Sequence, residues 1–271
     1  MKKFELTAES KINIFGKKLF RIKALISFGD VEEGETGGWI EKEENLEQSS
    51  GDAWVSGDAE VYGDAEVSGN ARVYGNARVY GNAEVSGNAE VYGNARVSGN
   101  AGVSGDAWVS GDARVSGNAE VYGNARVSGN AWVSGDAEVY GDAEVSGNAR
   151  VYGNARVYGN AEVYGNARVS GNAWVYGDAE VYGNARVSGN AEVYGNADYT
   201  TIHGFGTQFR TTTFFQCKDK QIRVSCGCFL GTIPEFREQV KNTREGKIAE
   251  EYLMIADLME KHFVKEKESG E

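Results

Sequence analysis

The chain has 271 residues, which is enough for one large domain or two small ones, and its 41% hydrophobic content is sufficient to bury a core. It carries 28 basic and 40 acidic residues, a formal net charge of −12, which disfavours direct binding to nucleic acid. No apolar run approaches the length of a membrane span, and no signal peptide is visible. We therefore expect no membrane partner.

The first segment, residues 1–50, is predicted to be an N-terminal β cap. Apolar residues alternate around a turn at Gly16-Lys17 and predict a hairpin over Lys11–Phe28, namely Ile12, Ile14, Leu19, Ile22 and Leu25. A Gly37-Gly38-Trp39 segment follows, and Trp39 is predicted to lie in the core of the cap. Such a cap is needed where a stack of repeats ends, because the end exposes apolar surface and unpaired backbone.

Residues 51–194 are 24 hexapeptides without an insertion, each reading Gly, Asn or Asp, Ala, a variable residue, Val, and Ser or Tyr. Ala and Val are two residues apart, so both point to one side of a short strand, while the variable residue and Ser or Tyr point outward. Gly followed by Asn or Asp tolerates the left-handed backbone of a sharp corner. Three such sides close an 18-residue triangular coil, so we predict about eight coils around a filled Val and Ala core.

The small-x-aliphatic units, from Ala53-Trp54-Val55 to Ala191-Glu192-Val193, resemble the hexapeptide-repeat proteins. This resemblance implies a left-handed parallel β-helix, a handedness that the period alone does not dictate. The Gly37-Gly38-Trp39 segment resembles the N-terminal cap of some bacterial members. The expected fold is therefore mainly β, with a cap over 1–50, a solenoid over 51–200 including one degenerate unit, and a small C-terminal α+β module over 201–271.

Taking every third hexapeptide together places the variable residues in three outward rows. The first row is Trp54, Arg72, Glu90, Trp108, Arg126, Glu144, Glu162 and Glu180. The second row is Glu60, Arg78, Arg96, Arg114, Trp132, Arg150, Arg168 and Arg186. The third row is Glu66, Glu84, Gly102, Glu120, Glu138, Arg156, Trp174 and Glu192, and beside it runs a tyrosine ladder of Tyr122, Tyr140, Tyr158, Tyr176 and Tyr194.

The arginines of the second row and the tyrosine ladder are the candidate binding residues. Guanidinium groups bind carboxylates or phosphates, and aromatic rows are good interface anchors. The alternative is that these rows are solvated faces. Residues 129–158 repeat 51–80 with one difference, at Asn130 against Asp52, and the shift of 13 hexapeptides rotates the copy by one face. That rotation favours length and rigidity over any one decorated surface.

The array lacks the groups that enzymes of the family would need. The resemblance implies acyltransferases as an alternative, and these use a general-base histidine and a loop inserted between coils. The chain has two histidines, His203 and His262, and both follow the array. An acyltransferase would therefore need an active site at a subunit interface. We expect no cofactor, and the irregular aspartates do not have calcium-binding spacing.

The C-terminal segment has a different residue pattern, which predicts a hairpin and two helices. Alternation over Thr211–Cys217 and Gln221–Cys228 predicts a hairpin. A Thr232-Ile233-Pro234-Glu235 capping box predicts a helix through about Val240. A second helix over about Lys247–Lys265 places one apolar face together, formed by Ile248, Tyr252, Ile255, Met259 and Phe263. Residues from Thr211 to Phe236 resemble the tail of uncharacterised phage and prophage proteins.

All three cysteines, Cys217, Cys226 and Cys228, lie in this segment. With His203 or His262 they are candidates for a Cys₃His zinc site, and the alternative is packed thiols. The odd count is typical of reduced thiols, so we expect a cytoplasmic protein. The resemblance to phage and prophage proteins implies that this cytoplasm is that of a bacterial host.

Three functions remain open from the sequence. The leading hypothesis is a non-catalytic phage-type protein-binding scaffold, in a sharper version an inhibitor of a host protein, whose C-terminal module docks a partner or drives self-association. The second is the interface acyltransferase. The third is a self-assembling structural protein in which arginine-rich and acidic faces pair between copies.

Overall fold

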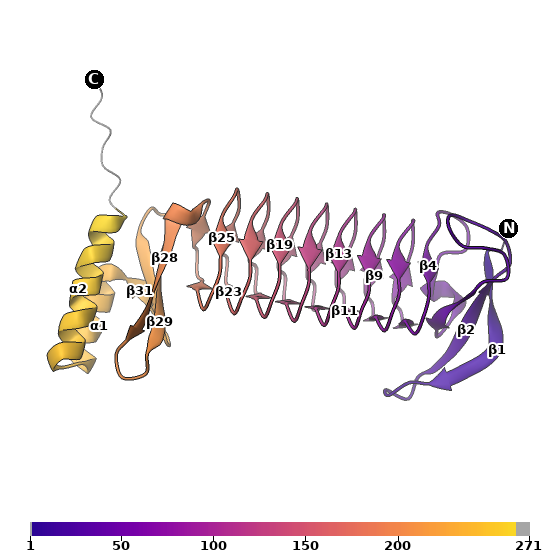
Figure 1. Ribbon diagram of the computed structural model, residues 1–271, viewed down its shortest axis with the longest axis horizontal. Coiled ribbons are helices and arrows are strands. Elements are labelled where there is room, and N and C mark those ends of the chain that lie inside the picture. The colour runs from indigo at the N-terminus through magenta and orange to yellow at the C-terminus, as the bar shows by residue number, and fades with distance from the viewer. Residues whose placement is uncertain (1, 264–271) are drawn as a thin grey trace, which may run out of the picture.

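The computed structural model describes residues 2–263, and its central part is a solenoid of stacked coils (Figure 1). Each hexapeptide forms a short strand and a corner, and each strand pairs in parallel with the strand three hexapeptides further along the chain. Consecutive strands therefore belong to three different sheets. This arrangement confirms the predicted triangular coil of three hexapeptides and the three rows. Trp54 and Glu60, the first members of two rows, are nevertheless buried under the N-terminal segment.

The solenoid strands carry one row on each sheet. The first row lies on β4 (Trp54–Val55), β7 (Arg72–Val73), β10 (Glu90–Val91), β13 (Trp108–Val109), β16 (Arg126–Val127), β19 (Glu144–Val145), β22 (Glu162–Val163) and β25 (Glu180–Val181). The second lies on β5 (Glu60–Gly63), β8 (Arg78–Gly81), β11 (Arg96–Gly99), β14 (Arg114–Val115), β17 (Trp132–Val133), β20 (Arg150–Val151), β23 (Arg168–Val169) and β26 (Arg186–Val187). The third lies on β6 (Glu66–Val67), β9 (Glu84–Val85), β12 (Gly102–Val103), β15 (Glu120–Val121), β18 (Glu138–Val139), β21 (Arg156–Val157), β24 (Trp174–Val175) and β27 (Glu192–Val193).

The solenoid interior contains the Ala and Val side chains predicted for it. Every Val of the array is fully buried, from Val55 to Val193, and the Ala residues beside them are equally inaccessible. Two small side chains per strand fill a narrow triangular space, because protein interiors pack nearly as densely as organic crystals. The interior is a structural core, and function must lie on the outside or at the ends.

The corners explain why glycine recurs at every sixth residue. Gly111, for example, has φ +67°, a conformation that other residues adopt at a cost. A Cβ atom there would also lie 2.9 Å from the carbonyl oxygen of Gly129 in the next coil. Glycine is therefore required both by the backbone conformation and by the close stacking of coils.

The residue after each corner glycine builds a hydrogen-bonded ladder along the rod. Asn88 Nδ2, for example, donates to Asp106 Oδ1 at 2.8 Å, and Asn124 Nδ2 donates to Asp142 Oδ1 at 2.8 Å. Aspartate accepts such a bond but has no donor to pass on, so it ends a run. No aspartate of the array stacks on another aspartate in the next coil. The corners therefore avoid like-charge neighbours, and the ladder gives these residues a structural role.

The N-terminal hairpin is longer than predicted. It consists of β1 (Phe4–Ile12) and β2 (Lys18–Ala24), which pair antiparallel around the turn at Gly16. Of the alternating apolar residues, Leu19 and Ile22 are buried, whereas Ile12 and Ile14 are 74% and 76% exposed. The hairpin tip projects from the rod, where Phe15 lies against the rings of Tyr62 and Tyr80.

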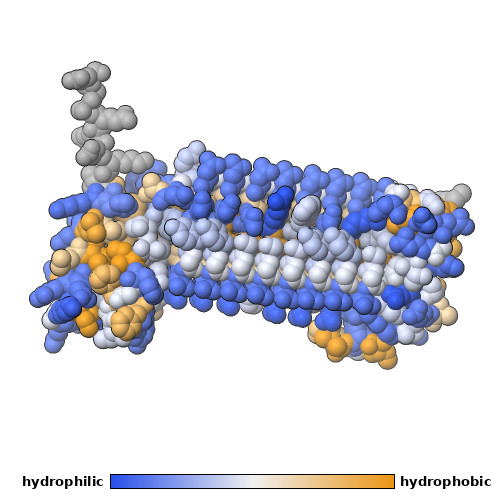
Figure 2. Space-filling view, viewed as in Figure 1, coloured by the Kyte–Doolittle hydropathy of each residue, from blue (hydrophilic) through white to orange (hydrophobic). Residues whose placement is uncertain are grey.

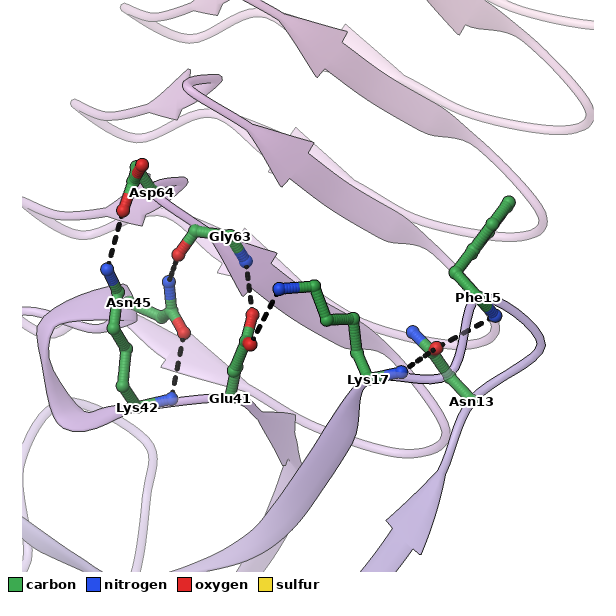
Figure 3. Close-up of polar contacts among 8 residues, drawn as sticks. All are labelled: Asn13, Phe15, Lys17, Glu41, Lys42, Asn45, Gly63 and Asp64. Carbon is green, nitrogen blue, oxygen red and sulfur yellow. Dashed lines mark hydrogen bonds and ion pairs between the residues drawn. The ribbon is translucent and has the colours of Figure 1, made fainter.

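The first coil begins before the array, at β3 (Thr36–Ile40). Trp39 and Ile40 pair in parallel with Glu60 and Val61, so the Gly-Gly-Trp segment is already a solenoid side. The short 3₁₀ turn η1 (Glu43–Asn45) completes the end. There, Asn45 Nδ2 donates to the carbonyl oxygens of Gly63 and Ala65, at 3.1 and 2.8 Å (Figure 3 shows the Gly63 contact). The cap thus satisfies backbone groups that the solenoid end would leave unpaired.

Neighbouring ion pairs hold the same end. Glu41 accepts hydrogen bonds from Gly63 N and Lys17 Nζ, and Lys42 Nζ contacts Asp64 at 2.7 Å (Figure 3). Trp39 is buried as predicted, with the Lys11 ammonium and the Arg21 guanidinium 4.5 and 4.3 Å from its ring centroids. It belongs to the cap structure.

The C-terminal module contains a four-stranded antiparallel sheet in the order β28 (Tyr199–Phe205), β29 (Arg210–Gln216), β30 (Ile222–Cys226) and β31 (Phe229–Thr232). The predicted hairpin is its centre, and the two outer strands were not predicted. The short turn η2 (Asn196–Asp198) leads into β28, so the degenerate repeat unit ends in this sheet. Tyr199, Phe215 and Cys217 join the Val and Ala core and close the second end of the solenoid.

Two helices, α1 (Ile233–Thr243) and α2 (Gly246–His262), cover the other side of this sheet (Figure 1). The predicted capping box is present, because Thr232 Oγ1 accepts from Glu235 N and Thr232 N donates to Glu235 Oε2. The predicted apolar face of α2 is confirmed, with Tyr252, Ile255 and Met259 buried. Val264 and Lys265, included in the predicted helix, lie outside the described residues. Within residues 2–263, neither helix is both long and apolar enough to cross a membrane.

Candidate functional site

The second row brings like charges directly against each other. Arg96 pairs in register with Arg78 on one side and Arg114 on the other, and Arg150 and Arg168 pair in the same way. Like charges on neighbouring strands are destabilising. At the row's ends, Arg78 Nε lies 3.5 Å from Glu60 and Arg186 donates to the carbonyl oxygen of Gly227. Nothing in the described chain offers an ion pair to the four arginines between them, Arg96, Arg114, Arg150 and Arg168.

Trp132 interrupts this row of arginines. Its Nε1 donates to Ser116 Oγ at 3.1 Å, so the indole lies along the row over the preceding coil. The Arg150 guanidinium lies 5.7 Å from its ring centroid, a cation–π distance. The ring remains 38% exposed. Within residues 2–263, the second row thus presents a large flat aromatic group flanked by guanidinium groups that have no ion pair.

The third row is acidic over five successive coils and has a gap at its centre. Glu66, Glu84 and Glu120 are exposed, while Glu138 contacts Arg156 at 2.8 Å. Between them Gly102 has no side chain, and an added Cβ would meet nothing within 4 Å. A shallow hollow therefore opens at Gly102, bordered by Glu84, Glu120 and Tyr122 among others. The place of Gly102 in this row was predicted, but the hollow was not.

The tyrosine ladder beside the third row is a continuous stack over four of its five members. Tyr122, Tyr140, Tyr158 and Tyr176 follow one another with ring centroids 4.9 to 5.0 Å apart and planes within 7°. Tyr194, the fifth, is turned by 63° against Tyr176 and is 62% exposed. The ladder is an aromatic stripe whose last ring departs from the stack where the repeats end.

Two of the ladder hydroxyls contact glutamates of the third row. Tyr176 Oη donates to Glu192 at 2.9 Å, and Tyr122 Oη lies 3.5 Å from Glu138. Burial and then the nearby carboxylates raise the pKa of Tyr122 and of Tyr176 to about 12. The rings therefore remain neutral donors at physiological pH. Three shorter tyrosine stacks were not predicted, although the spacing of one coil between their members could have revealed them: Tyr62–Tyr80, Tyr74–Tyr92 and Tyr164–Tyr182.

The three cysteines are not brought together. Cys217 belongs to the core at the solenoid end, where burial raises its pKa to about 11. Cys226 faces the helices and lies 3.1 Å from Thr212 Oγ1, its partner across the hairpin, while Cys228 is exposed in a turn. Residues 2–263 contain no group of three His, Cys, Asp or Glu side chains suited to a metal ion. The strand register pairs Cys226 with Thr212 and not with Cys217.

The two histidines lie in the C-terminal module. His203 on β28 is 3.4 Å from Thr211, and His262 ends α2 against the ring of Phe263. A cleft of this module is lined by Arg210, Arg244, Cys226 and Tyr252 among others, but by neither histidine. Its residues suit an anion better than a general-base reaction.

Apolar surface gathers at the two ends, whereas the side of the rod in view is mainly polar (Figure 2). At the N-terminal hairpin tip the exposed side chains are Ile12, Ile14 and Phe15, and in the C-terminal module they include Leu230, Met254 and Leu258. Met254 and Leu258 lie one turn apart on α2, so they form an apolar stripe on its outer side.

Comparison with known proteins agrees with this architecture. A family model described as the YdcK beta solenoid repeat matches eight windows, which overlap in places and together cover less than half of the chain: 65–81, 71–87, 89–105, 119–135, 143–159, 149–164, 161–177 and 179–195. Together with the stacked three-sided coils, this match supports a repeat β-helix family. The chain is a β-solenoid repeat protein. No curated protein sequence matches it.

Proposed function

We propose that the protein is a non-catalytic, phage- or prophage-type scaffold that binds a protein partner in a bacterial host. The observation that carries the proposal is the display of free arginines and stacked tyrosines in register on a solenoid with a filled core. Arginine and tyrosine are the residue types that most often dominate protein interfaces.

Rigidity supports this proposal. Each coil is hydrogen-bonded to the coils on both sides, and both ends are closed by caps. Side chains on such a frame lose little further freedom on binding, which favours affinity. A flexible surface of the same composition would lose more conformational freedom on binding.

In its sharper form the proposal is that the rod inhibits a host protein. The array has nine arginines against ten glutamates and eight aspartates, a net charge of −9, so a basic host protein is the favoured target. The apolar stripe of Met254 and Leu258 gives the C-terminal module a second contact surface, suited to docking the same partner.

The test is capture from bacterial lysate by the full-length chain, compared with two variants. One replaces Tyr140 and Tyr158 by Ser, and the other replaces Arg114 and Arg150 by Ser. A matched control replaces Glu144 and Glu162 of the first row by Ser. We expect one host protein whose capture falls at least severalfold in a row variant and not in the control. Capture of nothing above background would refute the proposal.

The non-catalytic part is tested separately with acetyl-coenzyme A, the acyl donor of the alternative function. We expect titration calorimetry to detect no heat of binding. Saturable binding that disappears on His203→Ala or His262→Ala would instead favour an acyltransferase.

A further inference from the structure

Two of the rows have complementary patterns over five successive coils. In the second row the order is Arg96, Arg114, Trp132, Arg150, Arg168. In the third row it is Glu66, Glu84, Gly102, Glu120, Glu138. Each arginine has a glutamate at the corresponding place, and the tryptophan corresponds to the glycine. The bulkiest outward residue thus matches the one position that lacks a side chain.

The spacing of the two patterns is the same because both are set by the stacking of coils. One residue per coil gives roughly 4.8 Å between neighbours in either row. Two rods laid side by side would therefore keep arginine and glutamate in step over all five coils. Both patterns also read the same in both directions, so the match holds whether the rods run parallel or antiparallel.

At the centre of the match, the two rows are complementary in both shape and charge. The hollow at Gly102 is bordered by Glu84 and Glu120, among other residues. The exposed indole of Trp132 is flanked in its row by Arg114 and Arg150. Seating the ring over the hollow places two guanidinium groups beside two carboxylates, and the ring can keep its hydrogen bond to Ser116.

Like charges stack in these two rows, and also at Glu144, Glu162 and Glu180 of the first row, but not at the corners of the same rod. At the corners no carboxylate stacks on another, as expected if like-charge contacts are avoided. In the two rows, by contrast, Arg96 stacks on Arg114, Arg150 on Arg168, Glu66 on Glu84 and Glu120 on Glu138. Such stacks are unfavourable in an isolated copy, and an oppositely charged row laid against them would relieve both sets.

We propose that the second row of one copy docks on the third row of a second copy, with Trp132 seated over the partner's Gly102 position. This inference goes beyond the proposed function, because it concerns contact between copies. The docked row has one unfavourable neighbour, since Arg156 of the third row faces Arg186 in the parallel arrangement and Arg78 in the antiparallel one. Arg156 is already bridged to Glu138, which softens that contact.

The two docking rows lie on different sides of the rod. A contact between unlike surfaces leaves one free row on each outer copy, so association does not stop at two copies unless the arrangement closes into a ring. We therefore expect a series of oligomers whose size grows with concentration.

Sedimentation velocity of the full-length chain tests the inference. In about 50 mM salt we expect association that rises with concentration, and in about 500 mM salt a large loss of it, because exposed charges are screened. Arg114→Glu with Arg150→Glu should weaken self-association by on the order of tenfold or more, and Glu84→Arg with Glu120→Arg should do the same. Gly102→Trp, which fills the hollow, should also weaken it.

Mixing the two charge-reversed variants is the decisive arm. In one variant both docking rows are acidic at the changed positions, and in the other both are basic, so the mixture should associate although neither variant does alone. Glu144→Arg with Glu162→Arg, on the first row, is the matched control and should leave self-association unchanged. Circular dichroism checks that each variant is folded.

A single monomeric species at low salt, association that persists in the reversed variants, or a mixture that stays monomeric would each overturn the inference. A monomeric chain that binds an acidic polymer would assign the arginines to a polyanion instead. A monomer that still captures a host protein would overturn this inference alone, whereas self-association through these rows without host capture would overturn the proposed host partner alone.

Discussion

The solenoid and the C-terminal module are stabilised in different ways, although they share one continuous junction. In the solenoid, every coil repeats the same contacts with the coils directly before and after it. In the module, Phe236 lies edge-on to both Phe214 of the sheet and Tyr252 of α2, three segments that no repeat relates. The difference teaches that a fault in the rod is a local fault in a one-dimensional stack, whereas a fault in the module affects a whole small core.

The largest effect is expected from a charge placed inside the rod. Val133→Asp would bury a carboxylate without a partner and should cost roughly 4 kcal/mol or more of the free energy of unfolding. Ser134→Asp, the next residue along and partly exposed, is the control and should change it by less than about 0.5 kcal/mol. Denaturant titration followed by circular dichroism measures both, and equal effects would mean that the filled interior does not stabilise the coil.

A similar loss of stability in the C-terminal module should affect a different part of the molecule. Phe236→Ala should cost about 3–5 kcal/mol, because it leaves a cavity between the sheet and both helices. Hydrogen exchange should then show faster opening of α1 and α2 while strands in the middle of the rod keep their protection. Loss of protection along the whole rod would show that the two regions unfold as one unit.

Comparing two glycines tests whether the backbone conformation at the corners requires glycine. Gly111→Ala should cost roughly 1–3 kcal/mol, because its φ is positive and the new Cβ would press on Gly129. Gly102→Ala, in extended backbone with open space above it, should leave stability unchanged or slightly improved. Comparing the melting temperatures of the two variants checks this, and similar shifts would contradict the account of the corners.

The corner ladders offer a smaller effect that responds to salt. Asn124→Asp would stack three carboxylates with Asp106 and Asp142, and should cost about 1 kcal/mol or more at low ionic strength. Asn148→Asp lies between two asparagines, so it loses a donated hydrogen bond without creating a like-charge stack. We expect added salt to restore the first variant more than the second in thermal melts. Equal salt responses would argue against like-charge avoidance at the corners.

The junction between rod and module should respond to alkaline pH. Burial raises the folded-state pKa of Cys217 to about 11, above the roughly 8.5 of an unfolded thiol, so the folded state holds this proton more tightly. Stability linked to this group is therefore fully present below about pH 8.5 and declines as the pH rises toward 11. Cys217→Ala should make the free energy of unfolding less dependent on pH over this interval. An unchanged pH dependence would mean that the thiol does not titrate on unfolding there.

Most of the rod was predictable from its residues, and the ends were less so. The three rows, the Val and Ala core and the tyrosine ladder follow from counting, because side-chain direction in a strand has period two and each coil takes three hexapeptides. Which apolar residues of the hairpin are buried could not be predicted, because the burial of Leu19 and the exposure of Ile12 and Ile14 depend on how the hairpin packs against the rod. The strands β28 and β31 were missed because their partners, not their own patterns, make them part of a sheet.

The candidate sites were likewise only partly predictable from the sequence. Which arginines and tyrosines stand in a row could be read from their spacing, and so could the identity of their neighbours in the adjacent coils. Two features could not be read from the sequence: four of the arginines have no ion pair within residues 2–263, and the site of Gly102 is an open hollow. Both depend on the positions of the surrounding side chains. The scattering of the cysteines was equally hidden, because it depends on strand register and on which face of β29 meets the rod.

The sequence by itself thus determined the solenoid. With an unbroken six-residue period, each short segment can bury Ala and Val and also turn at Gly in only one way, as one side of a coil. Only the tertiary structure decided how the rod ends. Closing each end requires residues distant in sequence, such as Asn45 against Gly63 and Cys217 beside Ala191, to meet unpaired backbone and exposed core. Such contacts depend on the whole fold, and no local pattern encodes them.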